Sequence, residues 1–198
     1  MSRARLEAFS DGVFAIAITL LVLNLAVPHV TGHLLQRLAS QWPSYLAYLV
    51  SFLVIGIVWI NHHRLCTFLS AVDIPLLYLN LALLLFTSML PFPAALLAEY
   101  IGSPEALPAT ALYGVWATFG STVFTLLWLY LLRHPALVAP ERLPQVAPSL
   151  KRSIVGPIAY GAATLVSFLS PGIATALYTA IVLYFAMAWL PGRRRVAR

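Results

Sequence analysis

Residues 9–27 read FSDGVFAIAITLLVLNLAV and decide the fold of this chain. A bilayer core is crossed by about 20 residues of helix, and this run is that long before it stops at Pro28. The run is too long for the apolar part of a signal peptide, and Ser10-Asp11 does not resemble a cleavage site of small residues. The segment therefore predicts a membrane-spanning helix.

The composition of the whole chain is that of an integral membrane protein. Of its 198 residues, 61% are hydrophobic and only 9% are charged, and the mean hydropathy is +0.89. An ordinary soluble domain is about 45–50% apolar and about 25% charged. Disorder needs low hydrophobicity and high charge, and the single cysteine, Cys66, has no partner for a disulfide within the chain. We therefore predict an all-α integral membrane protein.

Five further apolar runs follow the first, separated by stretches rich in proline, glycine and polar residues. Between the fourth and fifth runs, residues 133–150 contain four prolines and are predicted to be irregular. No loop is long enough for a soluble domain, so residues 1–198 are predicted to form a single transmembrane domain. The predicted spans cover about residues 9–27, 44–61, 74–99, 109–132, 153–169 and 172–190.

The basic residues predict the orientation of these spans. Eleven of the 12 Lys and Arg residues precede the first span, follow the sixth, or lie in the loops after the second and fourth spans. The loops on the other side contain Arg37 alone. Because cytoplasmic loops are rich in Lys and Arg, we expect both termini in the cytoplasm. This distribution favours a topological role for the net charge of +6 over nucleic-acid binding.

A belt of polar residues is predicted at the cytoplasmic ends of the first three spans. A carboxylate beside a span is costly unless it is solvated or paired. Two interpretations of Asp11 are open. Either Ser10 and Asp11 cap the first helix, or Asp11 belongs to a buried polar network that holds this helix at an internal axis. The belt consists of Arg5, Ser10, Asp11, Trp59, Asn61, His62, His63 and Asp73.

An uncharged stripe runs along the first span. Ile16, Leu20, Leu23 and Val27 recur at helical spacing, with Thr19 beside them. Such a stripe most often faces lipid or a protein core, but this one follows a costly polar segment. If several copies of the helix met around an axis, the stripe would form stacked apolar rings, and such constrictions gate by dewetting.

Three stretches of the chain carry a resemblance to a known family. They are Arg5-x-x-x-Phe9-Ser10-Asp11 with the run that follows to Leu23, Trp59-x-x-His62-His63-Arg64, and Asn80 through Pro91-Phe92-Pro93. Together they resemble the transmembrane protein 175 family of potassium channels in its short bacterial form. The resemblance covers roughly the first half of the chain.

The resemblance implies six helices per subunit and a homotetramer whose pore is lined by the first helix. Apolar pore rings are implied at Ile16, Leu20 and Leu23, and a threonine that aids selectivity at Thr19. The family signature includes Phe9, Ser10 and Asp11. The resemblance implies that Asp11 braces the pore helices together with Arg5 and the polar end of the second span. Asn24 stands where relatives often carry an acid. The implied partners are potassium ions, further copies of the chain and the lipid bilayer of a bacterial-type inner cell membrane, with no cofactor, tight metal site or nucleic acid.

Two other classes of function are open to a chain of this kind. His62, His63, Cys66 and Asp73 are metal-ligand types, but adjacent histidines on a helix point about 100° apart and rarely bind one ion. An enzyme is therefore not expected. A secondary transporter is the stronger alternative, although alternating access usually needs polar residues at mid-membrane. No predicted span has an ionisable residue at its centre. We therefore expect a potassium channel of weak to moderate selectivity over sodium.

Overall fold

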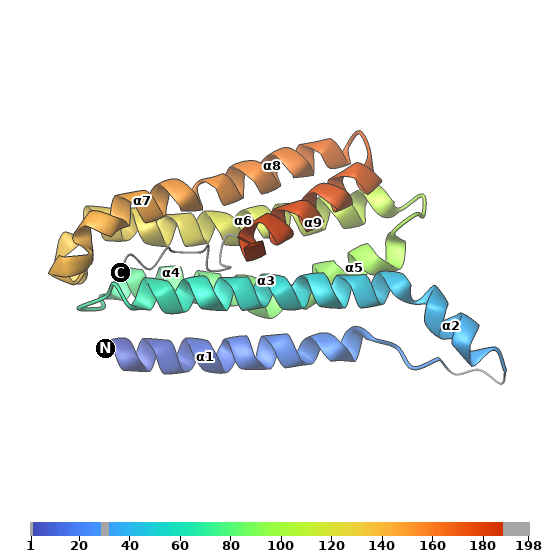
Figure 1. Cartoon of the computed structure of the whole chain (residues 1–198), viewed down its shortest axis with the longest axis horizontal. Helices are drawn as coiled ribbons and strands as arrows, with labels where there is room; N and C mark the ends of the chain where they lie inside the picture. Colours follow the sequence, from blue (N-terminus) through green and yellow to red (C-terminus); the bar gives the residue numbers. More distant parts are fainter. Residues whose placement is uncertain (1, 29–31, 188–198) are drawn as a thin grey trace, which may run out of the picture.

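The computed structural model describes residues 2–28 and 32–187 of the chain. Within these ranges the protein is helical, and the isolated bridge between Leu69 and Val138 is the one strand-type pairing. The helices run along the long axis of an elongated molecule (Figure 1). This confirms the all-α prediction. The predicted end of the sixth span, residues 188–190, and the basic residues at 193–198 lie outside the described residues.

The helical elements follow one another with short connections. They are α1 (Arg3–Leu20), η1 (Leu21–Asn24), α2 (Leu34–Ser40), α3 (Trp42–Cys66), α4 (Ile74–Met89), α5 (Pro91–Tyr100), α6 (Ala106–Arg133), η2 (Pro135–Leu137), η3 (Pro140–Arg142), α7 (Leu143–Ser153), α8 (Val155–Ser167) and α9 (Pro171–Met187).

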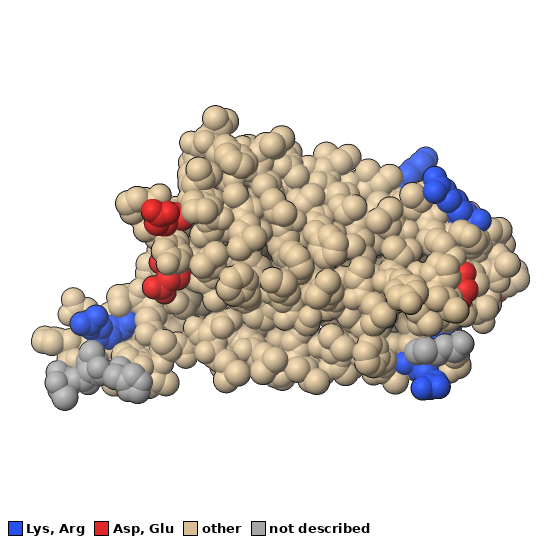
Figure 2. Space-filling view, turned by 180° about the vertical axis from the view of Figure 1, so that it is seen from behind, with Lys and Arg blue, Asp and Glu red and all other residues tan. Residues whose placement is uncertain are grey.

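Four helical segments are long and apolar enough to cross a membrane. They cover Arg3–Asn24, Trp42–Cys66, Ile74–Tyr100 and Ala106–Arg133, and a shorter apolar helix covers Pro171–Ala186. Figure 2 shows charged side chains at the two ends of the molecule and an uncharged surface between them on the face in view. This distribution suits a protein whose middle lies in hydrocarbon, where charged side chains are costly.

Prolines set several of the helix ends. Pro43 and Pro75 lie in the first turns of α3 and α4, where the missing amide would have had no partner within the helix. Pro91 opens α5 directly after Leu90, where α4 ends. The third predicted span therefore continues past its prolines as two helices.

The prediction of an irregular segment at residues 133–150 was wrong for its second half, because α7 begins at Leu143. Pro144 lies in the first turn of α7, where proline is tolerated. Val146 is buried and Leu150 packs against the core, so docking of one apolar face stabilises α7 despite Pro148 inside it.

A break separates α7 from α8 at Ile154. Proline has no amide hydrogen, so Pro157 leaves the carbonyl of Ser153 without its usual helical donor. The hydroxyl of Thr125 on α6 shares its one hydrogen between that carbonyl at 3.1 Å and the Ser121 carbonyl of its own helix at 2.9 Å, and it lies 2.8 Å from the Ser153 hydroxyl. The carbonyl released by the break is therefore satisfied by a neighbouring helix.

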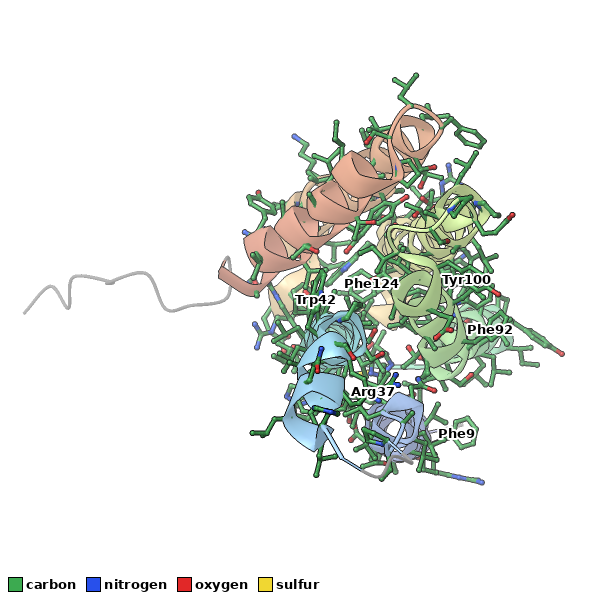
Figure 3. The ribbon with its side chains drawn as sticks, turned by 90° about the vertical axis from the view of Figure 1, so that its right-hand side faces the viewer. Phe9, Arg37, Trp42, Phe92, Tyr100 and Phe124 are labelled. Carbon is green, nitrogen blue, oxygen red and sulfur yellow. The ribbon has the colours of Figure 1, made fainter. Side chains whose placement is uncertain are left out.

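The bundle is organised around α6, which packs against α4, α5, α7, α8 and α9. Small residues allow close approach here: a Cβ at Gly120 would lie 2.4 Å from the Phe86 ring on α4. The first helix, α1, instead packs mainly against α3 and α4 at one edge of the bundle (Figures 1 and 3). It therefore has one packed face and one open face.

Candidate functional site

The two faces of α1 differ sharply in burial. Ile16 is 62% exposed, Leu20 48% and Leu23 75%, so all three predicted ring residues lie on the open face. Thr19 is also exposed, and its hydroxyl donates to the carbonyls of Ala15 and Ile16 at 3.0 and 2.9 Å. Because its hydrogen is used within the helix, the threonine oxygen offers lone pairs outward. The packed face consists of Leu6, Ser10, Phe14, Ala17 and Leu21.

A buried chain of polar side chains fixes the packed face of α1. The Asn80 amide nitrogen donates to the Ser10 hydroxyl at 3.0 Å, and the Asn80 side-chain oxygen lies 2.8 Å from Nε2 of His62. Since that oxygen is an acceptor, Nε2 of His62 is the donor. The three residues are at most 4% exposed. The rings of Phe14 and His62 pack at 5.4 Å between centroids, so α1, α3 and α4 are joined at one point.

A second contact lies beside this chain at the surface. Nε1 of Trp59 on α3 donates to Oδ1 of Asp11 at 2.9 Å. The helix begins at Arg3 with Ser2 at its N-cap, so Ser10 and Asp11 lie inside α1 and do not cap it. The capping interpretation is therefore wrong, and Asp11 is paired to a neighbouring helix at the edge of the network. We name Ser10, Asp11, Trp59, His62 and Asn80 the polar anchor.

A third contact holds the far end of the same segment. Asn24, the last residue of η1, donates its side-chain amide to the carbonyl of Pro91 at 3.3 Å. Pro91 is the first residue of α5, and that carbonyl lies near the break between α4 and α5. The segment from α1 through η1 is therefore tied to the bundle at both ends, which orients its open face.

Other predicted members of the polar belt do not join the anchor by any described contact. Arg5, Phe9 and His63 are exposed, and Phe9 projects outward from α1 (Figure 3). The Asn61 amide donates to the carbonyl of Ile57 on its own helix at 2.8 Å. Asp73 lies elsewhere in the fold, at the N-terminus of α4.

Asn80 was missed as a site residue by sequence reasoning, which used it only as the start of a matching stretch. A signal existed, because an asparagine within an apolar span needs hydrogen-bond partners. Its partners, however, come from two other helices, and helix spacing within one span does not identify them. Among the described residues no three His, Cys, Asp or Glu side chains group as metal ligands.

Asp73 stabilises the start of α4 by two hydrogen bonds. Oδ1 accepts the amide of Leu76 at 3.0 Å, and Oδ2 accepts the hydroxyl of Tyr130 at 2.6 Å. The slight burial of the carboxyl raises the pKa of Asp73, but the two hydrogen bonds outweigh this effect and hold the pKa below its usual value. A lowered pKa stabilises the fold at neutral pH, and this contribution is lost as the pH falls through the folded-state pKa.

Replacing Asp73 with alanine is expected to lower the free energy of unfolding by about 1 kcal/mol at neutral pH, because α4 loses its N-cap. Asp73→Asn is the control, since asparagine also caps helices but does not titrate. Unfolding in detergent is measured at neutral pH and below pH about 3.9, the ordinary pKa of aspartate. The wild type should lose more stability on acidification than Asp73→Asn does. Equal losses would contradict this role for the carboxylate.

Comparison with known proteins places this arrangement in a family. The model of the family described as endosomal/lysosomal potassium channel TMEM175 matches residues 5–91, which contain the anchor and the exposed stripe. A protein of Streptomyces collinus named as a potassium channel is 40% identical over 197 residues, covering 98% of this chain and 96% of that protein. The endosomal/lysosomal proton channel TMEM175 of Homo sapiens is 30% identical over 147 residues, covering 69% of this chain and 29% of that protein.

A solved structure extends the similarity to the fold. The crystal structure of a lysosomal potassium-selective channel TMEM175 homolog from Chamaesiphon minutus superposes with a TM-score of 0.84 at 38% identity. The match covers 94% of this chain and 97% of that one, so it includes the second half, where the sequence alone is less distinctive. The chain therefore belongs to the TMEM175 family.

Proposed function

We propose that this chain forms a homotetrameric potassium channel in which the open face of α1 from each subunit lines the pore. The names of two relatives support potassium as the conducted ion, since one is named as a potassium channel and the other as a potassium-selective homolog. We propose six spans per subunit, made by α1–η1, α3, α4–α5, α6, the stretch 153–169 that contains α8, and α9. The distribution of Lys and Arg supports cytoplasmic termini in a bacterial-type inner membrane.

The observation that carries the proposal is the contrast between the two faces of α1. One face is buried and tied to α3 and α4 by hydrogen bonds from Asn80 and Trp59. The other face exposes Ile16, Leu20 and Leu23 without any charge among them. A helix that only faces lipid has no need of a fixed rotation about its own axis. A pore helix does, because the same side chains must meet around the axis in every subunit.

The mechanism follows from the chemistry of that face. Four copies of Ile16, Leu20 and Leu23 form stacked apolar rings, with Ile16 as the tightest. Ions pass when the rings are wet, and the pathway closes when water leaves. Apolar rings offer no oxygens to replace an ion's hydration shell, so they separate potassium from sodium only weakly. The outward lone pairs of Thr19 supply oxygens beside the Ile16 ring. Conduction runs down the electrochemical gradient and needs no cofactor, and no catalytic step is assigned.

Flux into liposomes tests the proposal. Purified protein should carry potassium faster than sodium. Bilayer recordings should resolve single-channel currents, which a coupled carrier does not produce. Saturable flux with a fixed stoichiometry would favour the secondary transporter instead. Proton flux without potassium flux would overturn the assignment of the ion, an outcome suggested by the name of the human relative.

A further inference from the structure

A half-open cavity of about 130 Å³ lies between helices of the subunit, and no residue of α1 lines it. A single water needs about 10–15 Å³ by this measure, so the cavity is much larger than a hydration site. It lies among α3, α4, α6, α7, α8 and α9, and Phe124 on its wall is labelled near the centre of the bundle in Figure 3. On α6 its lining runs from Tyr113 to Trp128, which corresponds to about 22 Å at 1.5 Å per residue.

The lining of this cavity changes in character along its length. Most of it is apolar, and the hydroxyl of Ser121 in the middle donates to carbonyls of its own helix. Water filling the apolar part would therefore have few partners. The end beside Trp128 is polar, because residues from the C-terminal parts of α3 and α7 line it. They are Asn61, Arg64, Ser149, Arg152 and Ser153.

Two arginines at the polar end come from different helices. Arg64 lies in the last turn of α3 and Arg152 in the last turn of α7, and both line the cavity. Because both side chains line the same end of the cavity, one ligand there can meet both positive charges. Guanidinium groups bind phosphate by paired, charge-assisted hydrogen bonds. Basic pockets between membrane helices at the cytoplasmic side bind the head groups of anionic lipids.

We propose that this cavity binds an anionic phospholipid, with one acyl chain in the apolar part and its phosphate between Arg64 and Arg152. The length suits the chain, because half of a bilayer core is about 15 Å thick. The positive charges of Arg64 and Arg152 at the polar end suit the negatively charged phosphate of the head group. The chain's own residues 188–198 are a poorer occupant, since they include four arginines and would add to the positive charge at this end. The site would tie α3, α6 and α7 together by a ligand.

Lipid binding to the purified, delipidated full chain tests the proposal by native mass spectrometry. Phosphatidylglycerol and phosphatidylcholine with identical acyl chains are the probes. Phosphatidylglycerol should bind about tenfold more tightly, the equivalent of about 1.4 kcal/mol. Arg152→Gln should remove most of this preference. Lys151→Gln is the matched control, because Lys151 is its exposed neighbour and does not line the cavity. Equal binding of the two lipids, or an equal loss in both variants, would overturn the proposal.

A second pair of variants tests where the acyl chain lies. Val58 lines the cavity, whereas Leu53 is an exposed residue of the same helix that does not. Val58→Phe should weaken the binding of phosphatidylglycerol, and Leu53→Phe should leave it unchanged. Unchanged binding in Val58→Phe would overturn the placement. Binding by a chain ending at residue 187 but not by the full chain would also overturn it, because residues 188–198 would then be the occupant. The readout is bound lipid rather than ion flux, so the result does not depend on the proposed channel function.

Discussion

Substituting asparagine for Ile16 is expected to raise sodium flux through the protein by about tenfold, which corresponds to about 1.4 kcal/mol of barrier. Ile16 is 62% exposed on the open face of α1. In the proposed pore, amides in the Ile16 ring would hold water that isoleucine side chains exclude, so the dewetting barrier would fall. Potassium flux should rise less, because the wild type already conducts it, and the selectivity for potassium should decrease. Fluxes of both ions into liposomes give the measurement.

Val115→Asn is the matched control for this change. Val115 is 56% exposed on α6, far from the stripe in sequence and on another helix. If α1 lines the pore, Val115→Asn should leave both fluxes close to wild type. Equal behaviour of the two variants would contradict the proposed pore, because a polar side chain on the open face of α1 would then affect flux no more than one on α6.

Replacing Asn80 with leucine is expected to cost about 2–6 kcal/mol of stability, because two buried partners lose their hydrogen bonds at once and each unsatisfied group costs about 1–3 kcal/mol. Asn80 is 4% exposed and bridges Ser10 of α1 to His62 of α3. Leucine has a similar size, so packing changes little. Thermal unfolding in detergent should show a clear decrease in Tm. Flux should also decrease, because α1 would lose its fixed rotation.

Asn61→Leu is the control for the loss of an asparagine. Asn61 is half-buried, and its side-chain amide donates to the carbonyl of Ile57 on its own helix, so this hydrogen bond does not join two helices. Its Tm should remain close to that of the wild type. If Asn80→Leu is no less stable than Asn61→Leu, the polar anchor does not hold α1 in place.

The helical character and the stripe on α1 could be predicted from the sequence because both depend on local spacing. Ile16, Leu20 and Leu23 share a face in an α-helix, and the structure leaves all three exposed, with Ile16 and Leu20 on α1 and Leu23 on η1. Whether that side meets water, lipid or another subunit depends on further copies of the chain, which helix spacing does not describe. The assignment to a pore therefore stays a proposal.

The contacts between helices were harder to predict. Ser10, Asp11, Trp59 and His62 were expected at one depth, and the structure joins them in two separate contacts rather than one belt. Depth follows from the order of the spans, but rotation about each helix axis depends on packing. Residues 143–150 were mispredicted for a related reason, since α7 is stabilised by burial of Val146 rather than by helix propensity.

The hydrogen bond from Thr125 to the Ser153 carbonyl has a consequence for biosynthesis. A buried carbonyl without a hydrogen bond costs about 1–3 kcal/mol, so α7 and α8 inserted without α6 would carry such a penalty at the break between them. Chains emerge from the ribosome N-terminus first, and Thr125 is therefore already in the translocon's surroundings when Ser153 arrives. The order of synthesis therefore supplies the Thr125 hydroxyl before the Ser153 carbonyl needs a donor. A rearranged chain with its last two spans encoded first would lack that advantage.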